Sequence, residues 1–176
     1  MRIHLRTALR AENNVIGVLD IVLNVRSLPI QSALTVTDNL KQAVPFFGVH
    51  DMERSFHFYV DLLGFRKRWE WVDEGKLRWC WLERGGAALM LQEFWKEGHH
   101  ANVPTTPLGV GVSINFICED ALALYHEFRE KGLEPKRPFV GNHMWVTQLR
   151  DPDGYLLDFE SPTDAPEDSV YNPASL

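Results

Sequence analysis

The chain has 176 residues, of which 45% are hydrophobic and 24% charged, which is the size and balance of a soluble globular protein with a core of its own. The formal net charge of −6 argues against a nucleic-acid partner, because binding a phosphate backbone needs a surplus of Lys and Arg. No stretch approaches the roughly 18 uninterrupted apolar residues of a membrane span, and Cys80 and Cys118 form no CxxC motif, which favours free thiols in a reducing compartment.

Residues 1–42 differ in pattern from the rest of the chain, and we expect them to form an N-terminal extension. The apolar run VIGVLDIVL at 15–23 fits one stripe of a short helix and equally a strand, so both alternatives stay open. A basic start before this run resembles a signal peptide, but Asn13, Asp20 and Asn24 interrupt the apolar residues. We therefore expect no signal peptide and a cytoplasmic location.

The first strong pattern begins at Ala43. The apolar run AVPFFGV predicts a strand, Asp51 has the side chain of a helix N-cap, and Gly64 predicts the end of a helix with helical apolar spacing. Strands are then expected at 65–72, 76–82 and 87–94. Residues 95–109, with two His, two Pro and two Gly, predict a loop.

The same order repeats from residue 111. The run GVSINFIC predicts a strand, Asp120 an N-cap and Gly132 a helix stop, with strands expected at 133–140, 143–150 and 155–161. Asp51 and Asp120 lie 69 residues apart, and the same offset pairs Phe46 with Asn115. The sequence therefore predicts an α+β fold of two tandem βαβββ modules, at about 43–97 and 110–161. One sheet face of each module lacks a helix, so the modules are expected to pack together or across a dimer.

The last predicted hairpin, residues 143–161, carries the least expected side chain. Its turn is Asp151-Pro152-Asp153-Gly154, in which Pro152 restricts φ to about −65°, Asp153 bonds its own backbone and Gly154 accepts a positive φ. Asp158 interrupts the apolar strand after this turn and shares a face with Leu156 and Glu160. That face is either solvated or functional. Beyond the hairpin, residues 162–176 are expected to be a mobile C-terminal tail.

The two modules, with a first copy reading VHDMERSFHFYVDLLGF and a last hairpin reading RDPDGYLLDFE, resemble the vicinal oxygen chelate superfamily. This superfamily includes glyoxalase I, extradiol dioxygenases, fosfomycin-resistance enzymes and bleomycin-resistance proteins. The resemblance covers residues 43–161 and implies curved mixed sheets around a cavity. It also implies a small-molecule ligand and a homodimer.

Enzymes of this superfamily hold a divalent metal with His and Glu in the first and last strands of each module. Those places fall here on Val44, Ser113, Leu91 (Met90 or Gln92 if the match shifts by one residue) and Asp158. Only Asp158 has the chemistry of a metal ligand, and a divalent ion needs three or four ligands. The resemblance therefore implies the metal-free, bleomycin-resistance-like branch, with no metal and no cofactor.

The predicted ligand-binding residues are those expected on the cavity face, where rings stack on a ligand and polar groups attract amines. They are Phe46, Trp79, Trp81, Glu93, Asn115, His143, Asp158 and Glu160. The place of the two tryptophans depends on one turn. A two-residue Gly85-Gly86 loop pairs Cys80 with Leu91 on the cavity side and puts both tryptophans beneath the helix, whereas a three-residue loop does the reverse.

No pattern identifies a nucleophile with its base, so no catalytic residue is predicted. The leading hypothesis is an antibiotic-resistance type of protein that sequesters a cationic or aromatic compound without a metal. One alternative is a metal-dependent lyase, isomerase or dioxygenase with a relocated site built from Glu93, His143 and Asp158 or Glu160. Two others are a metal-free acid–base enzyme using Glu93 or Asp158 with His143 and an association module acting through residues 1–42.

Overall fold

The computed structural model describes residues 3–11, 14–23 and 39–173 and divides the chain into two compact units, Met1–Gln42 and Ala43–Leu176. In the first unit β1 (Ile3–Ala11) pairs antiparallel with β2 (Asn14–Leu23). The apolar run after Asn14 is therefore a strand, and the helical alternative is wrong. Residues 24–38 of the predicted extension lie outside the described residues.

The second unit begins with the first βαβββ module. Its elements are β3 (Phe46–Val49), α1 (Met52–His57), the π-helix η1 (Phe58–Leu62), β4 (Arg66–Asp73), β5 (Lys76–Arg84) and β6 (Ala87–Glu93). The Asp51 side chain accepts the Arg54 N–H at 3.0 Å, and Gly64 ends the helical segment at φ +72°, as predicted. The wider last turn, in which the Leu63 N–H donates to the Phe58 carbonyl at 2.9 Å, was not predicted.

The second module repeats the order. Its elements are β7 (Ser113–Ile117), α2 (Ala121–Glu130), β8 (Phe139–Gly141), β9 (Met144–Arg150) and β10 (Leu156–Pro162). Asp120 caps α2 by accepting the Ala123 N–H at 2.9 Å. The strand predicted at 133–140 is wrong except at its end, because Pro135 and Pro138 interrupt this segment and have no N–H to donate to a neighbouring strand.

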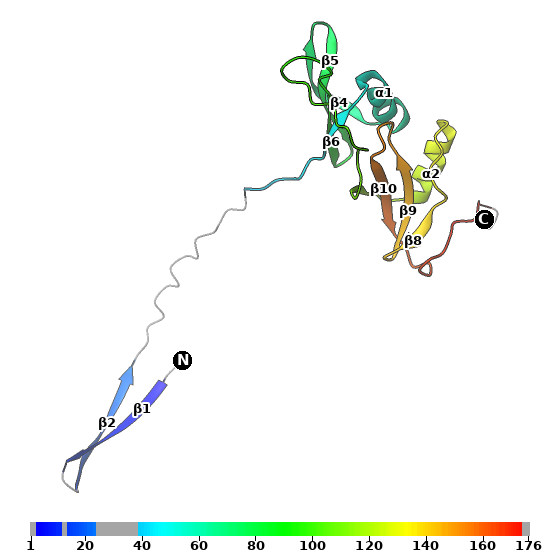
Figure 1. Ribbon diagram of the computed structural model, residues 1–176. Helices are drawn as coiled ribbons and strands as arrows, with labels where there is room; N and C mark the ends of the chain where they lie inside the picture. The colour runs from blue at the N-terminus through cyan, green and yellow to red at the C-terminus, as the bar shows by residue number, and fades with distance from the viewer. Residues whose placement is uncertain (1–2, 12–13, 24–38, 174–176) are drawn as a thin grey trace. The chain divides into compact units, whose positions relative to one another are not determined.

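Each module forms one mixed four-stranded sheet, with strand orders β3-β6-β5-β4 and β7-β10-β9-β8. The first and last strands of each module are parallel and the other pairs antiparallel. Helix α1 packs on β5 and β6, and α2 packs on β9 and β10 (Figure 1). This confirms the predicted α+β fold of two tandem modules. In the part of the chain described, no helix has the length and apolar character needed to cross a membrane.

The core lies on the side of each sheet that faces its helix, and it continues from one module into the other. Leu89, Leu91 and Phe128 are fully buried, each contributing about 1.5–3 kcal/mol of apolar transfer free energy. Phe116 contacts Phe65 of the first module, with ring centroids 5.9 Å apart. The two modules therefore share one hydrophobic core.

The turn between β9 and β10 docks onto the first module. Asp151 accepts the N–H groups of Asp153 (3.0 Å) and Tyr155 (2.8 Å) and the Tyr59 hydroxyl (3.0 Å). Asp153 was expected to bond its own backbone. It instead contacts Nδ1 of His50 at 2.6 Å and accepts the Ser55 hydroxyl at 3.1 Å.

Residues 168–171 of the predicted mobile tail instead pair with β8 and the residue before it. The Val140 N–H donates to the Ser169 carbonyl and the Tyr171 N–H to the Pro138 carbonyl, both at 2.8 Å. The Tyr171 side chain is buried, and its ring contacts Trp145 and Tyr125. Sequence composition missed this because one tyrosine anchors a segment that is otherwise polar and rich in proline. Residues 174–176 lie outside the described residues.

Candidate functional site

The length of the β5–β6 turn determines which side chains of these two strands point into the core and which point away from it. Arg84 pairs with Ala87 and Cys80 with Leu91, so the loop has the two residues Gly85-Gly86. Cys80 and Leu91 are both fully buried on the helix side of the sheet. A loop of this length was expected to put Leu91 on the cavity side and both tryptophans beneath the helix, and the structure reverses both placements. Trp79 and Trp81 lie on the side away from the helix, which we call the open face.

Four tryptophans share the open face of the first sheet and form what we call the aromatic patch: Trp69, Trp71, Trp79 and Trp81. Trp69 lies opposite Trp81 and Trp71 opposite Trp79, and directly opposed residues share one sheet face. The rings of Trp69 and Trp81 meet edge to face with centroids 5.1 Å apart. Trp69 and Trp71 were not predicted as site residues. Their spacing of two, combined with the hairpin register, was the available signal.

The open face of the second sheet carries a set of hydrogen-bonded polar side chains, the polar cluster, which consists of Ser113, Asn115, Gln148, Asp158 and Glu160. Asp158 lies between Asn115 of β7 and Gln148 of β9 in the strand register. The Gln148 amide donates to Asp158 Oδ1 at 2.8 Å, and the Asn115 amide donates to Glu160 Oε1 at 2.8 Å. Among the described residues, the other oxygen of each carboxylate accepts no side-chain hydrogen bond.

Two carboxylates lie on one face of β10, and the charge of Asp158 makes Glu160 harder to ionise. Asp158 is only 7% exposed, and Glu160 follows it by two positions on β10. Partial burial, followed by the charge of Asp158, raises the pKa of Glu160 above its usual value. A positively charged group beside the pair lowers the cost of ionising Glu160, so the polar cluster favours cations.

Two predicted site residues, Glu93 and His143, lie away from the open faces of both sheets. Glu93 shares the helix side of the sheet with Leu91 and forms an ion pair with Arg78. His143 lies in the β8–β9 turn at φ +58°, and its backbone N–H donates to Glu167 at 3.2 Å. His143 precedes Gln148 by five residues, about 16 Å along a strand, so it does not reach Asp158. Both assignments to the cavity face were wrong because they followed the reversed face of Leu91 and an assumed strand at residue 143.

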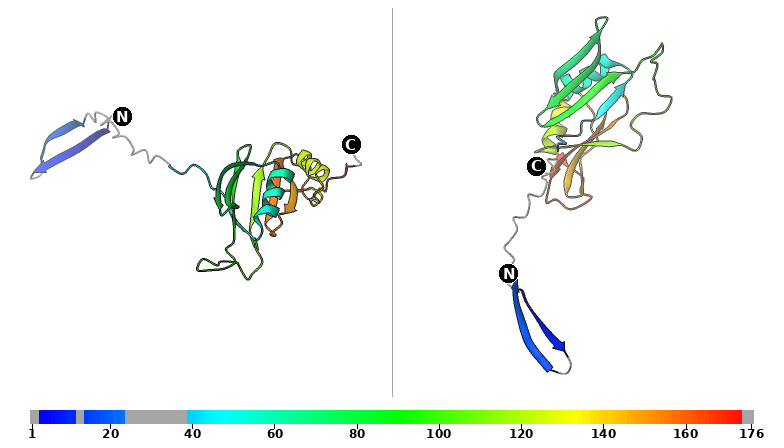
Figure 2. Two further views of the ribbon diagram at one scale, coloured as in Figure 1. Left: turned by 90° about the horizontal axis from the view of Figure 1, so that it is seen from above. Right: turned by 90° about the vertical axis from the view of Figure 1, so that its left-hand side faces the viewer.

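Phe46 occupies the open face of β3, opposite Met90, and is 56% exposed. It also lines an apolar pocket of about 780 Å³ together with Tyr155 and the loop from Pro104 to Val112. Figure 2 shows this part of the chain, drawn in green, extending away from the sheets between β6 and β7. Phe46 therefore stands where the open face meets this apolar pocket.

The residues at the superfamily's metal positions do not fit a divalent ion. Val44 precedes β3, and Leu91 is in the core, so the open-face positions of β6 are Met90 and Gln92. Asp158 alone has a strong oxygen ligand at the inherited places, against the three or four that such an ion takes. Among the described residues, no group of three or more His, Cys, Asp or Glu side chains is arranged to hold a metal ion. The relocated site proposed from Glu93 and His143 is not assembled.

Comparison with known proteins identifies a family model and structures of similar fold. A model described as the Glyoxalase/Bleomycin resistance protein/Dioxygenase superfamily matches residues 40–159. Among solved structures, TnmS3, an antibiotic binding protein from Streptomyces sp. CB03234, is 22% identical; the alignment covers 70% of this chain and 98% of TnmS3, with a TM-score of 0.53. A glyoxylase/bleomycin resistance protein/dioxygenase domain from Frankia sp. EAN1pec is 15% identical, with 72% and 95% covered and a TM-score of 0.55. At these identities the structural likeness concerns the fold alone. No curated protein sequence matches the chain.

Proposed function

The chain belongs to the glyoxalase/bleomycin resistance protein/dioxygenase superfamily, and from that premise we propose that it binds and sequesters a small compound that carries a flat ring and a positive charge, without using a metal ion. The observation that carries the proposal is the pair of carboxylates, Asp158 and Glu160, on the open face of the second sheet. In the part of the chain described, no cationic side chain is hydrogen-bonded to either carboxylate. A ligand ammonium or guanidinium supplies that charge.

The aromatic patch supports the ring part of the ligand. Indole faces stack on flat apolar groups and attract cations, and such contacts contribute about 0.5–2 kcal/mol each. Trp69 and Trp71 are 53% and 45% exposed, so the patch is accessible in the single chain. TnmS3, which has the same fold, is named as an antibiotic binding protein, and a resistance role by sequestration is the corresponding proposal for this chain.

We propose further that the protein acts as a homodimer. The open faces leave large apolar side chains uncovered in the single chain, among them Phe46 at 56%, Trp69 at 53% and Ile117 at 70% exposed. An apolar surface of this kind is usually covered by a partner or a ligand. A second copy placed across the open faces would bring an aromatic patch opposite a polar cluster and enclose a ligand between them.

The test is a binding titration on the full chain, purified without a chelator. The two probes are metal-free bleomycin, which is a cationic glycopeptide, and a planar acridine cation, with quenching of tryptophan fluorescence as the readout. We expect saturable binding of at least one probe. Asp158→Asn should weaken it about tenfold or more, since hydrogen bonds to charged groups contribute roughly 1.5–3 kcal/mol. The matched control is Glu53→Gln, an exposed acid on α1, which should bind as the parent does.

Equal affinity of the Asp158→Asn and Glu53→Gln variants, or no binding of either probe, would overturn the proposal. Metal analysis of the same preparation separates the two leading hypotheses. A near-stoichiometric content of Ni, Zn, Fe or Mn that also raises the unfolding temperature would contradict binding without a metal and favour the lyase, isomerase or dioxygenase alternative.

A further inference from the structure

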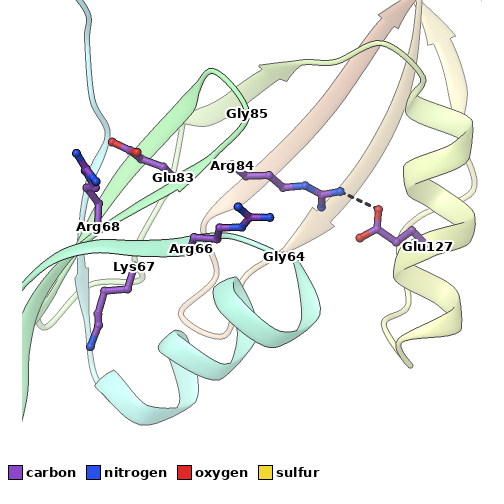
Figure 3. A pocket seen from close by; sticks show the side chains of 8 residues that line it. All are labelled: Gly64, Arg66, Lys67, Arg68, Glu83, Arg84, Gly85 and Glu127. Atoms are coloured by element: carbon purple, nitrogen blue, oxygen red, sulfur yellow. Dashed lines mark hydrogen bonds and ion pairs between the residues drawn. The ribbon is translucent and has the colours of Figure 1, made fainter.

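A second hollow lies at the end of the β4–β5 ladder, beside α2, with a volume of about 680 Å³ (Figure 3). Its walls carry four cationic side chains, Arg66, Lys67, Arg68 and Arg84, and two carboxylates. Such a surplus of positive charge is unexpected in a chain with a formal net charge of −6. None of the predicted ligand-binding residues lines it.

Of the two carboxylates of the pocket, Glu127 is ion-paired and Glu83 accepts a hydrogen bond from a neutral group. Glu127 accepts Arg84 at 2.8 Å and Lys131 at 2.9 Å. Glu83 accepts the indole N–H of Trp81 at 2.8 Å. The indole is neutral, so Glu83 keeps its charge, and it lies opposite Arg66 in the strand register. The pocket still carries four cationic side chains against two carboxylates, which leaves a surplus of positive charge.

Arg66 and Arg68 are the cations that remain. Lys67 has a carboxylate partner in Glu70. In the part of the chain that the structure describes, neither Arg66 nor Arg68 lies within ion-pair distance of a carboxylate. The guanidinium of Arg68 lies 5.6 Å from the Trp69 ring centroid, which holds it without neutralising it. The two guanidinium groups therefore offer planar hydrogen-bond donors to an incoming acceptor.

Arg84 is held in place at the back of the pocket. It donates to the Leu63 carbonyl at the end of η1 and to Glu127 of α2. Its guanidinium also packs on Gly64, where a Cβ added to the glycine would stand 3.5 Å from the Arg84 side chain. Figure 3 shows the Arg66 side chain extending from β4 on the same side as Arg84. Arg84 is fixed by these contacts, whereas Arg66 has no carboxylate partner within ion-pair distance among the described residues. An anion that binds beside both would offset their charges without having to reorder Arg84.

We propose that this pocket binds a small oxyanion, the phosphate or carboxylate group of a soluble ligand. Both groups match the planar donors of a guanidinium in two parallel hydrogen bonds, and both neutralise like charges brought close together. The pocket borders the aromatic patch, because Arg68 lies over Trp69 and Glu83 accepts the Trp81 indole N–H. Its proposed ligand is nevertheless an anion, whereas the ligand proposed for the open faces is a cation, so binding at the pocket is tested separately from the function proposed above.

The experiment measures heat of binding and unfolding temperature for the full chain with inorganic phosphate, and separately with citrate, in a low-salt buffer. Sodium chloride at matched ionic strength is the reference. We expect a rise in unfolding temperature above that reference with at least one of the two anions, and the responsive anion identifies the kind of group. The Arg66→Gln/Arg68→Gln double variant should bind about tenfold or more weakly.

The matched control is Arg137→Gln, an exposed arginine that does not line the pocket; it should bind as the parent does. Circular dichroism of the double variant checks that it folds, as expected because both replaced side chains are exposed. The proposal is overturned if neither anion exceeds the chloride reference, or if the double variant binds as tightly as Arg137→Gln.

Discussion

Asp151 and Asp153 stand two residues apart in one turn and connect the modules through different partners. Burial is the main reason why the pKa of Asp151 is raised, and the hydrogen bonds that it accepts oppose this shift. The neighbouring Tyr59, also buried and next to this carboxylate, has a pKa raised well above its usual value. The turn is therefore a buried polar junction, and its hydrogen bonds matter more than its exposure to ligands.

Removing the Asp151 carboxylate should destabilise the protein strongly. Asp151→Ala leaves the Tyr59 hydroxyl and two backbone N–H groups without their acceptor, and we expect a loss of about 3 kcal/mol or more in the free energy of unfolding. Urea denaturation measures it. Tyr59→Phe removes one of those bonds and should cost about 1 kcal/mol. A loss no greater than that of Asp164→Ala, an exposed acid in the tail, would contradict this account.

Because of Glu160, the affinity for the proposed cationic ligand should depend on pH. Its pKa is raised by burial and by the charge of Asp158, so it takes up a proton at a higher pH than an ordinary glutamate as the pH falls. Affinity for a cation should therefore decline as the pH falls through that raised pKa, and Glu160→Gln should remove this part of the decline. Fluorescence titrations of an acridine cation from pH 7 to about pH 4 measure it. An unchanged pH profile in Glu160→Gln would count against the role of this side chain.

At the scale of elements, the C-terminal tail covers strand β8, which would otherwise be an edge of the second module's sheet. Strand β8 would be an exposed edge, but residues 168–171 pair with its backbone. Covering an edge in this way blocks pairing with other chains. The tail therefore belongs to the folded unit, although its composition is that of a loop.

Tyr171 should be the residue that holds this tail. It is 8% exposed, and its hydroxyl lies 2.9 Å from His126 Nε2. Tyr171→Ala should lower the free energy of unfolding by about 3 kcal/mol, as for other large buried rings. Hydrogen exchange should show faster exchange at the Val140 amide, whose partner is Ser169. Val170→Ala, at a position 56% exposed, serves as control and should change little.

Glu127 connects α2 to the end of η1 through Arg84, and its effect on stability depends on pH. Burial opposes ionisation, but hydrogen bonds from Arg84 and Lys131 outweigh it and lower the pKa of Glu127 below its usual value of 4.5. A carboxyl group whose pKa is lower in the folded than in the unfolded chain stabilises the fold at pH values above its unfolded-state pKa. This stability is lost as the pH falls through the folded-state pKa.

Glu127→Gln should therefore lower the free energy of unfolding by about 1 kcal/mol at pH 7, with little difference from the parent near pH 3. Urea denaturation at both pH values measures the change. Glu130→Gln, on an exposed part of the same helix, should show no such dependence. A difference that persists unchanged at pH 3 would show that packing, not charge, is responsible.

At the scale of the whole molecule, the second unit has its own continuous core. A protein comprising residues 43–176 should therefore fold cooperatively without the first unit, with one unfolding transition by calorimetry.

We also predict that this 43–176 protein sediments as a dimer and that replacing both Trp69 and Trp71 with Ser shifts it towards the monomer. Glu74→Ser, an exposed turn residue, is the control. A monomeric parent would contradict the homodimer proposal.

Local patterns in the sequence were sufficient for the order of elements. Asp51 and Asp120 cap the two helices as predicted, and Gly64 and Gly132 end them at φ +72° and +81°, because caps and stops depend on a few neighbouring residues. The repeated offset between the modules, with the motif around RDPDGYLLDFE, was enough to identify the superfamily. These features needed no knowledge of distant contacts.

The faces of the sheets were decided only by the tertiary structure. Strand residues alternate sides, so one wrong reference residue, Leu91, reversed the place of Glu93 and tied the place of Trp79 and Trp81 to the wrong loop length. The partners of Asp153 and Tyr171 are likewise distant in sequence: His50 is 103 residues away and His126 is 45 away. Sequence alone therefore determined which elements form and in what order, whereas packing against the helices decided which side chains face a ligand.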